Sequence, residues 1–232
     1  MLFITINSIE MVDFIMNKTE EKALNYLKEN KKDFLDKYLD GYKVQDIKTA
    51  IFTAGASGAG KTEYAISRKE KEPFLLHMDI DDIRDFFISI GYNGTNSSDY
   101  QRPASKGVNW LFDRASKKGY SFILDSNFAE ATIEQSNIQR LLDKEYIVEI
   151  NYIFRDIEKS FEFAKKRESI TKRKVPLEVV KRSFKNSFDT TLLIKSIFND
   201  AIILNLIDRE NDIIYEDIDE NQFFDLLKKE IV

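Results

Sequence analysis

The chain contains no cysteine, only three prolines and only eight glycines in 232 residues. Without cysteine, disulfide bonds and thiolate metal sites are excluded, and the composition fits the reducing cytosol. Proline and glycine interrupt regular elements most strongly, so their scarcity predicts much helix with few breaks. We therefore expect a helix-rich cytoplasmic protein.

Long apolar runs and an excess of positive charge are also lacking. No segment approaches the ~20 apolar residues of a membrane helix, so no membrane contact is expected. Residues 1–16 lack a basic leader and are interrupted by Glu10 and Asp13, which argues against a signal peptide; Met11 or Met16 could be the true start. The net charge of −5 makes a nucleic-acid partner unexpected, although it is compatible with a local basic groove.

The segment from Gly55 to Thr62 matches the phosphate-binding loop pattern G-x-x-x-x-G-K-[ST]. Its glycines allow successive backbone N–H groups to turn inward around phosphate oxygens. Lys61 places a positive charge near the β- and γ-phosphates, and Thr62 offers a hydroxyl to Mg²⁺. The residues expected to bind the nucleotide are Gly55, Ala56, Ser57, Gly58, Ala59, Gly60, Lys61 and Thr62.

The flanking sequence supports this motif over an ordinary glycine-rich turn. An apolar, β-branched run at residues 49–54 precedes the loop, and the helix-compatible residues 63–68 follow it. A strand, a loop and a helix in this order are the context that the pattern needs. The helix also points the positive end of its dipole at the bound anion.

Apolar runs and helical patterns alternate along the rest of the chain. The expected strands cover residues 49–54, 74–79, 122–125, 147–154 and 201–206, with a possible edge strand at 212–215. The expected helices cover residues 18–46, 82–90, 103–118, 130–143, 156–167, 177–198 and 220–230. This alternation predicts an α/β phosphate-loop fold, with a mostly parallel sheet of five to six strands flanked by helices on both faces.

The length suits one α/β domain, with two functional parts along the chain. Residues 47–232 are expected to form the phosphate-loop domain, and residues 1–46 an N-terminal helical extension. Gly41 is a plausible helix stop within the extension. The apolar stripe of the extension favours packing on the nucleotide domain. A partner-binding arm is the alternative.

Acidic residues follow two of the expected strands, and they should meet at one rim of the sheet. Ligands of parallel sheets bind at the carboxyl ends of the strands, which places Asp79, Asp81 and Asp125 beside the phosphate loop. A carboxylate there can accept a proton from a substrate hydroxyl during phosphoryl transfer. Capping of the next helix by Asp81 or Asp82 is the alternative reading.

The chain lacks the signatures of two other phosphate-loop classes. A GTPase should carry Asn-Lys-x-Asp after a later strand, and no such motif occurs there. A motor ATPase usually shows Asp-Glu after its third strand, whereas Asp125 is followed by Ser126. A small kinase remains, and the basic segment 167–176 fits its mobile arginine lid, because guanidinium groups stabilise the transferring phosphoryl group. A solvated loop at a helix end is the alternative for this segment.

At this point the chain resembles the zeta-toxin family of kinases. The resemblance rests on the phosphate loop, on Asp79-x-Asp81-x-x-Arg84, and on a lid with Arg167 and Arg173, and it covers roughly residues 48–190. It implies a phosphate-loop kinase core that uses ATP and Mg²⁺. It also implies phosphorylation of UDP-N-acetylglucosamine at the 3′-hydroxyl of the sugar, and restraint by an antitoxin protein.

The resemblance assigns a role to each matching residue. Lys61 would bind the β- and γ-phosphates, and Thr62 would bind Mg²⁺. Asp81 would be the general base, and the arginines Arg167 and Arg173 would clamp the transferring phosphoryl group. The remaining assignments are substrate-side support by Asp79 and Arg84, and a metal or substrate contact by Asp125.

One departure from the family affects the expected acceptor. The family tends to show Glu-Gly-Thr after the third strand, where this chain has Asp125, Ser126 and Asn127. The acid is shorter and the next two side chains are bulkier, so contacts at this rim must differ. Two alternatives stay open: a kinase acting on another small molecule, a nucleotide or a 5′-hydroxyl nucleic-acid end, and a nucleotide-binding regulatory module without transfer activity.

Two further features have structural interpretations. His77, the only histidine, lies inside an apolar strand and is expected to be buried and structural rather than catalytic. Residues 99–102 open a helix and are expected to be a solvated helix start rather than part of the substrate pocket.

Overall fold

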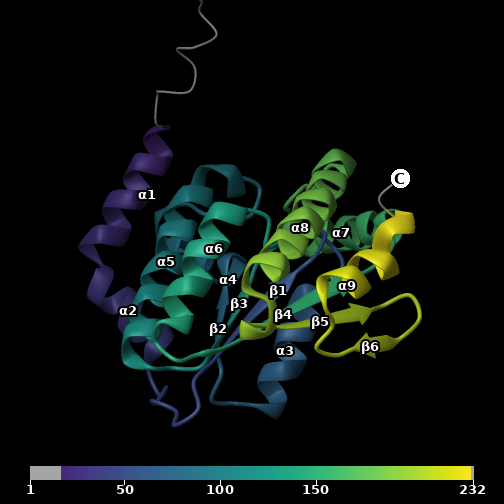
Figure 1. The fold of residues 1–232 in the computed structure, drawn as a ribbon. Coiled ribbons are helices and arrows are strands. Elements are labelled where there is room, and N and C mark those ends of the chain that lie inside the picture. Colours follow the sequence, from purple (N-terminus) through teal and green to yellow (C-terminus); the bar gives the residue numbers. More distant parts are fainter. Residues whose placement is uncertain (1–16, 231–232) are drawn as a thin grey trace, which may run out of the picture.

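Residues Thr49–Ala54 form β1, an inner strand of a six-stranded sheet in the computed structural model (Figure 1). The structure describes residues 17–230, so the expectations for a signal peptide and for the start position lie outside the described residues. The strand order is β2-β3-β1-β4-β5-β6. The other strands are β2 Leu76–Asp79, β3 Phe122–Asp125, β4 Ile147–Phe154, β5 Ile203–Asp208 and β6 Ile213–Tyr215.

The pairing of the strands confirms the expected sheet. β1 pairs parallel with β3 and β4, β3 pairs with β2, β4 pairs with β5, and β6 alone runs antiparallel, against β5. Every residue of β1 except Thr49 is buried, as is typical of a parallel strand covered on both faces. The register sets Asp79 directly opposite Asp125, at the carboxyl ends of β2 and β3.

Helices cover both faces of the sheet, as expected. They are α1 Lys18–Glu29, α2 Lys31–Leu39, α3 Lys61–Lys71, α4 Ile80–Arg84, α5 Gln101–Lys118, α6 Ala131–Leu142, α7 Ile157–Thr171, α8 Leu177–Phe198 and α9 Glu220–Leu227. The described part of the chain contains no helix with both the length and the apolar character needed to cross a bilayer.

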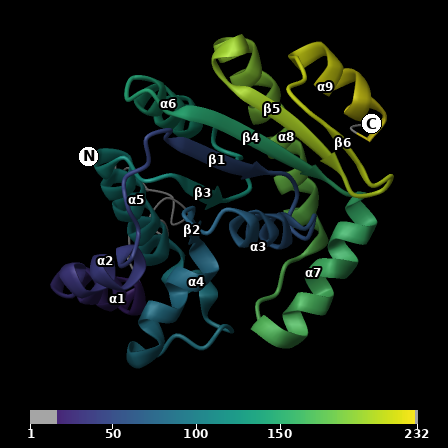
Figure 2. The same ribbon diagram turned by 90° about the horizontal axis from the view of Figure 1, so that it is seen from below.

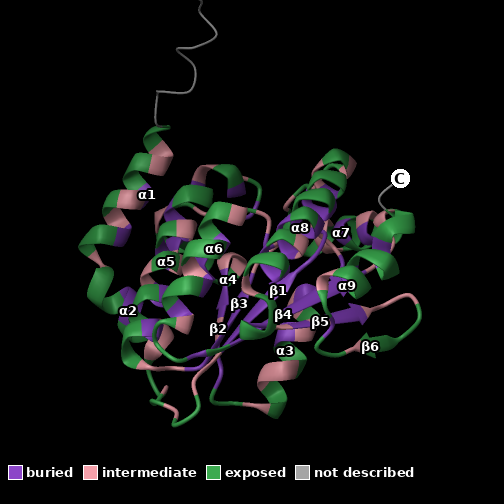
Figure 3. Ribbon diagram, in the orientation of Figure 1, coloured by how far each residue is buried: buried purple, intermediate pink, exposed green. Residues whose placement is uncertain are grey.

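The two faces of the sheet have different helical cover (Figure 2). On one face α3 packs against β1 and β3, where Ala65 and Leu75 form a small cluster with Ile51 and Ile123. On the other face α5, α6 and α8 cover a larger core, in which Phe112 of α5 lies edge-on to Phe122 of β3. Buried positions therefore concentrate on the sheet and on the inner sides of these helices (Figure 3).

The N-terminal helix predicted over residues 18–46 is two shorter helices. α1 ends at Glu29 and is capped by Asn30, whose side chain donates to the Tyr26 carbonyl oxygen at 2.8 Å. α2 ends at Leu39, before Gly41. Both helices pack on α5. A Cβ on Gly107 of α5 would lie 2.8 Å from the ring of fully buried Phe34, so α2 approaches α5 closely. The expected packing of these helices on the nucleotide-binding core is confirmed.

Candidate active site

The phosphate loop turns sharply between β1 and α3 and lies against neighbouring backbone. Gly55 has φ +125° and Gly58 has φ +85°. A Cβ on Gly55 would lie 2.3 Å from the Ile153 carbonyl oxygen, and one on Gly58 would lie 2.0 Å from that of Ser160. Only glycine fits these two positions, because both the φ angle and the space exclude a side chain.

The helix that follows the loop begins at Lys61, and the side chain of Lys61 folds back under the loop. Its Nζ donates to the carbonyl oxygens of Gly55 at 3.2 Å and Ala56 at 2.7 Å. Burial lowers the pKa of Lys61 to about 8, although the charge of Asp125 opposes the shift and that of Arg167 adds to it. The ammonium group is therefore held at the end of a helix whose backbone N–H groups face the same space.

Asp125 lies at the end of β3 with both carboxylate oxygens directed to neighbours. Oδ1 accepts a hydrogen bond from Thr53 at 2.9 Å, and Oδ2 lies 3.5 Å from Nε2 of His77. Burial alone would raise the pKa of Asp125, but the adjoining side chains of His77 and Thr62 and the charge of Lys61 lower it below the ordinary value. Asp125 is thus an ionised carboxylate beside the Thr62 hydroxyl.

His77 belongs to this site, which its position in the sequence did not reveal. Only 8% of its side chain is exposed, as expected for a buried histidine. One imidazole nitrogen of His77, one carboxylate oxygen of Asp79 and one of Asp125 all lie within 4.8 Å of one another. The alternation of side chains along β2 places His77 and Asp79 on one face, toward Asp125.

Asp79 caps α4. The alternative interpretation of the sequence assigned this capping role to Asp81 or Asp82. Its Oδ1 accepts a hydrogen bond from the Asp81 backbone N–H at 2.8 Å, and α4 begins at Ile80, earlier than predicted. Burial, together with the nearby charges of Asp125 and Asp81, raises the pKa of Asp79 to about 7. Capping by Asp79 leaves the side chain of Asp81 free to face the cavity.

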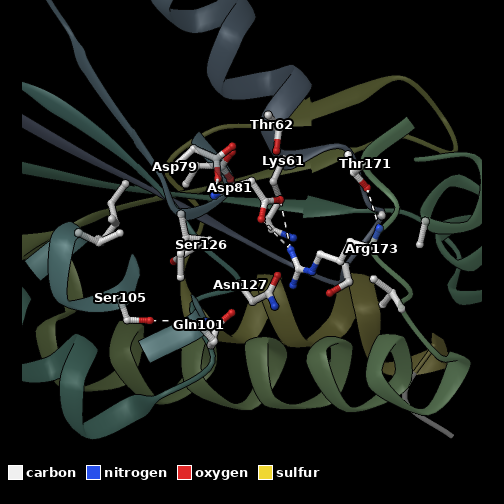
Figure 4. Close-up of a pocket in the computed structure, with 18 of the residues that line it drawn as sticks. Lys61, Thr62, Asp79, Asp81, Gln101, Ser105, Ser126, Asn127, Thr171 and Arg173 are labelled. Atoms are coloured by element: carbon white, nitrogen blue, oxygen red, sulfur yellow. Dashed lines mark hydrogen bonds and ion pairs between the residues drawn. The ribbon is translucent and has the colours of Figure 1, made fainter. Parts of the chain in front are cut away.

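Asp81 is held by two arginines, of which Figure 4 shows Arg173. Arg84, one helical turn later, pairs with Oδ1, and Arg173 donates to Oδ1 at 2.9 Å and to Oδ2 at 3.2 Å. Arg84 is fully buried and also donates to Gln101, so it fixes Asp81 from behind rather than lining the cavity. Arg173 is 92 residues away in the sequence and reaches Asp81 from the segment after α7.

The predicted lid is partly helical. α7 continues to Thr171, so Arg167 lies on a helix and only residues 172–176 form a connection to α8. The helix ends at Lys172, which has φ +57°. Arg167 lines the cavity, and its guanidinium group makes no hydrogen bond or ion pair to another residue of the described chain. It is therefore available to an anion.

These side chains surround one cavity of about 370 Å³ at the carboxyl edge of the sheet. The phosphate loop, the ends of β2 and β3, α5, α6, α7 and residue Arg173 all contribute to its walls. The side chain of Gln101 lines the cavity and donates a hydrogen bond to Ser105 (Figure 4). The expectation that residues 99–102 are a solvated helix start outside the substrate pocket was therefore wrong for Gln101. Ser126 and Asn127, the departure noted in the sequence, also line the cavity.

Sequence reasoning missed Glu134 and Asn137 of α6, which also line the cavity. The two residues lie three positions apart and so share one face of the helix. Acidic residues are common in the first turn of a helix, however, because their charge interacts favourably with the helix dipole. No local signal distinguished Glu134 from such a residue.

Comparison with known proteins agrees with this geometry. The family model described as zeta toxin matches residues 32–220. No curated protein sequence matches the chain. A structure from the PezAT chromosomal toxin–antitoxin system of Streptococcus pneumoniae is 17% identical, with a TM-score of 0.64 over 94% of this chain and 96% of that chain. A structure of AvrRxo1-ORF1:-ORF2 with ATP is 16% identical, with a TM-score of 0.65 over 93% of this chain and 73% of that chain. At these identities the structural likeness concerns the fold.

Proposed function

Because the chain belongs to the zeta-toxin family and has a phosphate-loop kinase fold, we propose that it transfers the γ-phosphoryl group of ATP to a hydroxyl of a nucleotide sugar such as UDP-N-acetylglucosamine. The observation that supports this most directly is the convergence of Lys61, Asp81, Arg167 and Arg173 on one cavity. Phosphoryl transfer requires cations that bind phosphate oxygens and a carboxylate that accepts the hydroxyl proton, and these side chains supply both.

The loop and Lys61 would bind the triphosphate. The glycines leave room for phosphate oxygens against the backbone, and the buried Lys61 adds a charge at the helix N-terminus. ATP in the structure of the AvrRxo1-ORF1:-ORF2 complex supports the choice of nucleotide.

Thr62 and Asp125 fit a divalent cation such as Mg²⁺. A hydroxyl and an ionised carboxylate are hard oxygen donors, and Oδ2 of Asp125 has no hydrogen-bond partner among the described residues. Bound there, the metal would neutralise charge on the β- and γ-phosphates.

Asp81 would act as the general base. It accepts the proton of the acceptor hydroxyl as that oxygen attacks the γ-phosphorus, while the bond from phosphorus to the β,γ-bridging oxygen breaks and ADP leaves. Arg167 and Arg173 would stabilise the charge on the equatorial oxygens. Arg84 and Asp79 would hold α4 and Asp81 in position on the acceptor side.

The family and its toxin–antitoxin neighbour also support a protein partner. The pneumococcal structure belongs to a toxin–antitoxin system, so we propose that an antitoxin restrains this chain. The bulkier Ser126 and Asn127 favour a second possibility at the acceptor: a kinase of the same mechanism acting on a different hydroxyl compound.

The test is transfer of labelled γ-phosphate from ATP, with Mg²⁺, to a panel of acceptors. The panel contains UDP-N-acetylglucosamine, other UDP-sugars, nucleotides and 5′-hydroxyl oligonucleotides, and Lys61→Ala is the blank. Label on UDP-N-acetylglucosamine alone supports the proposal, and label elsewhere keeps the mechanism but changes the acceptor. ATP binding without any transfer would refute the kinase assignment and favour a regulatory module.

A further inference from the structure

Glu134 is a buried carboxyl group in the cavity that none of the steps above uses. It lies in the first turn of α6, lines the cavity and is 7% exposed. Its Oε2 has no hydrogen-bond partner among the described residues. Buried polar atoms in folded proteins are nearly always paired, so an unpaired carboxylate oxygen at a cavity wall calls for a ligand.

No basic residue of the described chain forms an ion pair with Glu134. The nearest basic side chain on the same helix, Arg140, is already bound to Asp113 at 3.1 Å and to Oδ1 of Asn137 at 3.0 Å. Because Asn137 uses its oxygen for Arg140, its amide nitrogen is left to donate to Glu134. Burial raises the pKa of Glu134 to about 7, although this hydrogen bond opposes the shift, so the side chain is a carboxylate above that pH. The carboxyl group is thus oriented by an amide and has no ion-pair partner among the described residues.

The cations that line the cavity come from elements other than α6. Lys61, Arg167 and Arg173 come from α3, α7 and the segment after α7, and they suit phosphate oxygens. The α6 side instead offers Glu134 and Asn137, with Asn127 from the adjoining loop. A carboxylate repels an anion and binds a hydroxyl or N–H donor strongly when the site is buried.

We propose that Glu134 is a specificity-determining residue: its carboxylate accepts a hydrogen bond from a hydroxyl or amide N–H of the acceptor, and it excludes acceptors that place a phosphate or carboxylate against α6. This inference rests on the proposed function, since it assigns the sugar of a nucleotide sugar to the α6 side. The diphosphate of that acceptor then lies away from Glu134. Asn137 is the positioning residue for the carboxylate.

The test compares the wild type with Glu134→Gln, which preserves shape and removes the charge. Glu130→Gln is the matched control, because Glu130 precedes the same helix, is exposed and does not line the cavity. Calorimetry at about pH 8, where Glu134 is ionised, measures binding of two probes, UDP-N-acetylglucosamine and UDP, to each protein saturated with ADP. The second probe lacks the sugar and so reports binding that does not involve Glu134.

Glu134→Gln should weaken binding of UDP-N-acetylglucosamine about tenfold or more, as expected for loss of a charge-assisted hydrogen bond. Its affinity for UDP and both affinities of Glu130→Gln should stay within about twofold of the wild type. Equal loss for both probes, no loss for the sugar-bearing probe, or no binding of that probe to the wild type would each overturn the inference.

Phosphate transfer, measured separately, distinguishes this inference from the proposed function. Sugar-dependent binding that needs Glu134, without any transfer, would reject the kinase assignment and retain the role of Glu134. Transfer to UDP-N-acetylglucosamine with the same KM in Glu134→Gln and in the wild type would retain the kinase assignment and reject the role of Glu134.

Discussion

The burial of Glu134 predicts a pH-dependent stability that one substitution should remove. Burial raises the pKa of Glu134 from an ordinary value of 4.5 to about 7. Between these values the unfolded chain has released the proton while the folded protein keeps it, so the free energy of unfolding falls as pH rises. The stabilisation that comes from the raised pKa is lost completely above about pH 7. A difference of about 2.5 pKa units corresponds to about 3 kcal/mol.

The perturbation is Glu134→Gln, which cannot ionise. We expect the variant to resemble the wild type near pH 4.5 and to be more stable by about 2–3 kcal/mol at pH 8. Urea denaturation followed by circular dichroism at the two pH values measures this. Asp79 also has a raised pKa, of about 7, but it is present in both proteins, so its contribution cancels in the difference.

Glu130→Gln is the control. Glu130 is exposed and its charge is the smallest contribution to the raised pKa of Glu134, so the variant should keep nearly all of the wild-type pH dependence. The reasoning is refuted if Glu134→Gln and the wild type show the same pH dependence to within about 0.5 kcal/mol. That outcome would mean that water or a cation reaches the carboxylate. The claim of a desolvated acceptor contact would then lose its physical basis.

Three further substitutions test the site and the fold. Asp81→Ala should lower kcat by about 10²–10⁴-fold while the Kd for ATP stays within about twofold; normal transfer by this variant would exclude Asp81 as the base. Gly58→Ala should abolish measurable ATP binding in calorimetry because its Cβ would meet the Ser160 carbonyl, whereas Gly41→Ala, with a similar φ but open space, should bind ATP normally. Phe34→Ala should destabilise the protein by about 3–5 kcal/mol in urea denaturation, and a loss below about 1 kcal/mol would show that α2 is peripheral.

Much of the sheet could be predicted because its signals are local. The strands at residues 49–54, 122–125 and 147–154 have the predicted bounds, since parallel strands covered on both faces read as short apolar, β-branched runs. Helix boundaries were less accurate. The break at Asn30 and the extension of α7 to Thr171 depend on capping and packing that composition does not encode.

Residue types and their spacing were enough to predict the phosphate loop, the alternation of strands and helices, and the edge of the sheet that carries the acids. These features follow from residue type and spacing, because glycine alone tolerates the loop's φ angles and parallel strands end at one edge. Asp79 and Asp125 could therefore be placed together without any structure.

Contacts between side chains far apart in the sequence could not be predicted in this way. The pairing of Asp81 with Arg173, the approach of His77 to Asp125, and the position of Glu134 in the cavity all depend on how helices dock on the sheet. Docking also decides burial, and burial sets the pKa values of Lys61 and Glu134. Desolvation is a property of the packed molecule, so neither residue type nor spacing along the chain can reveal it.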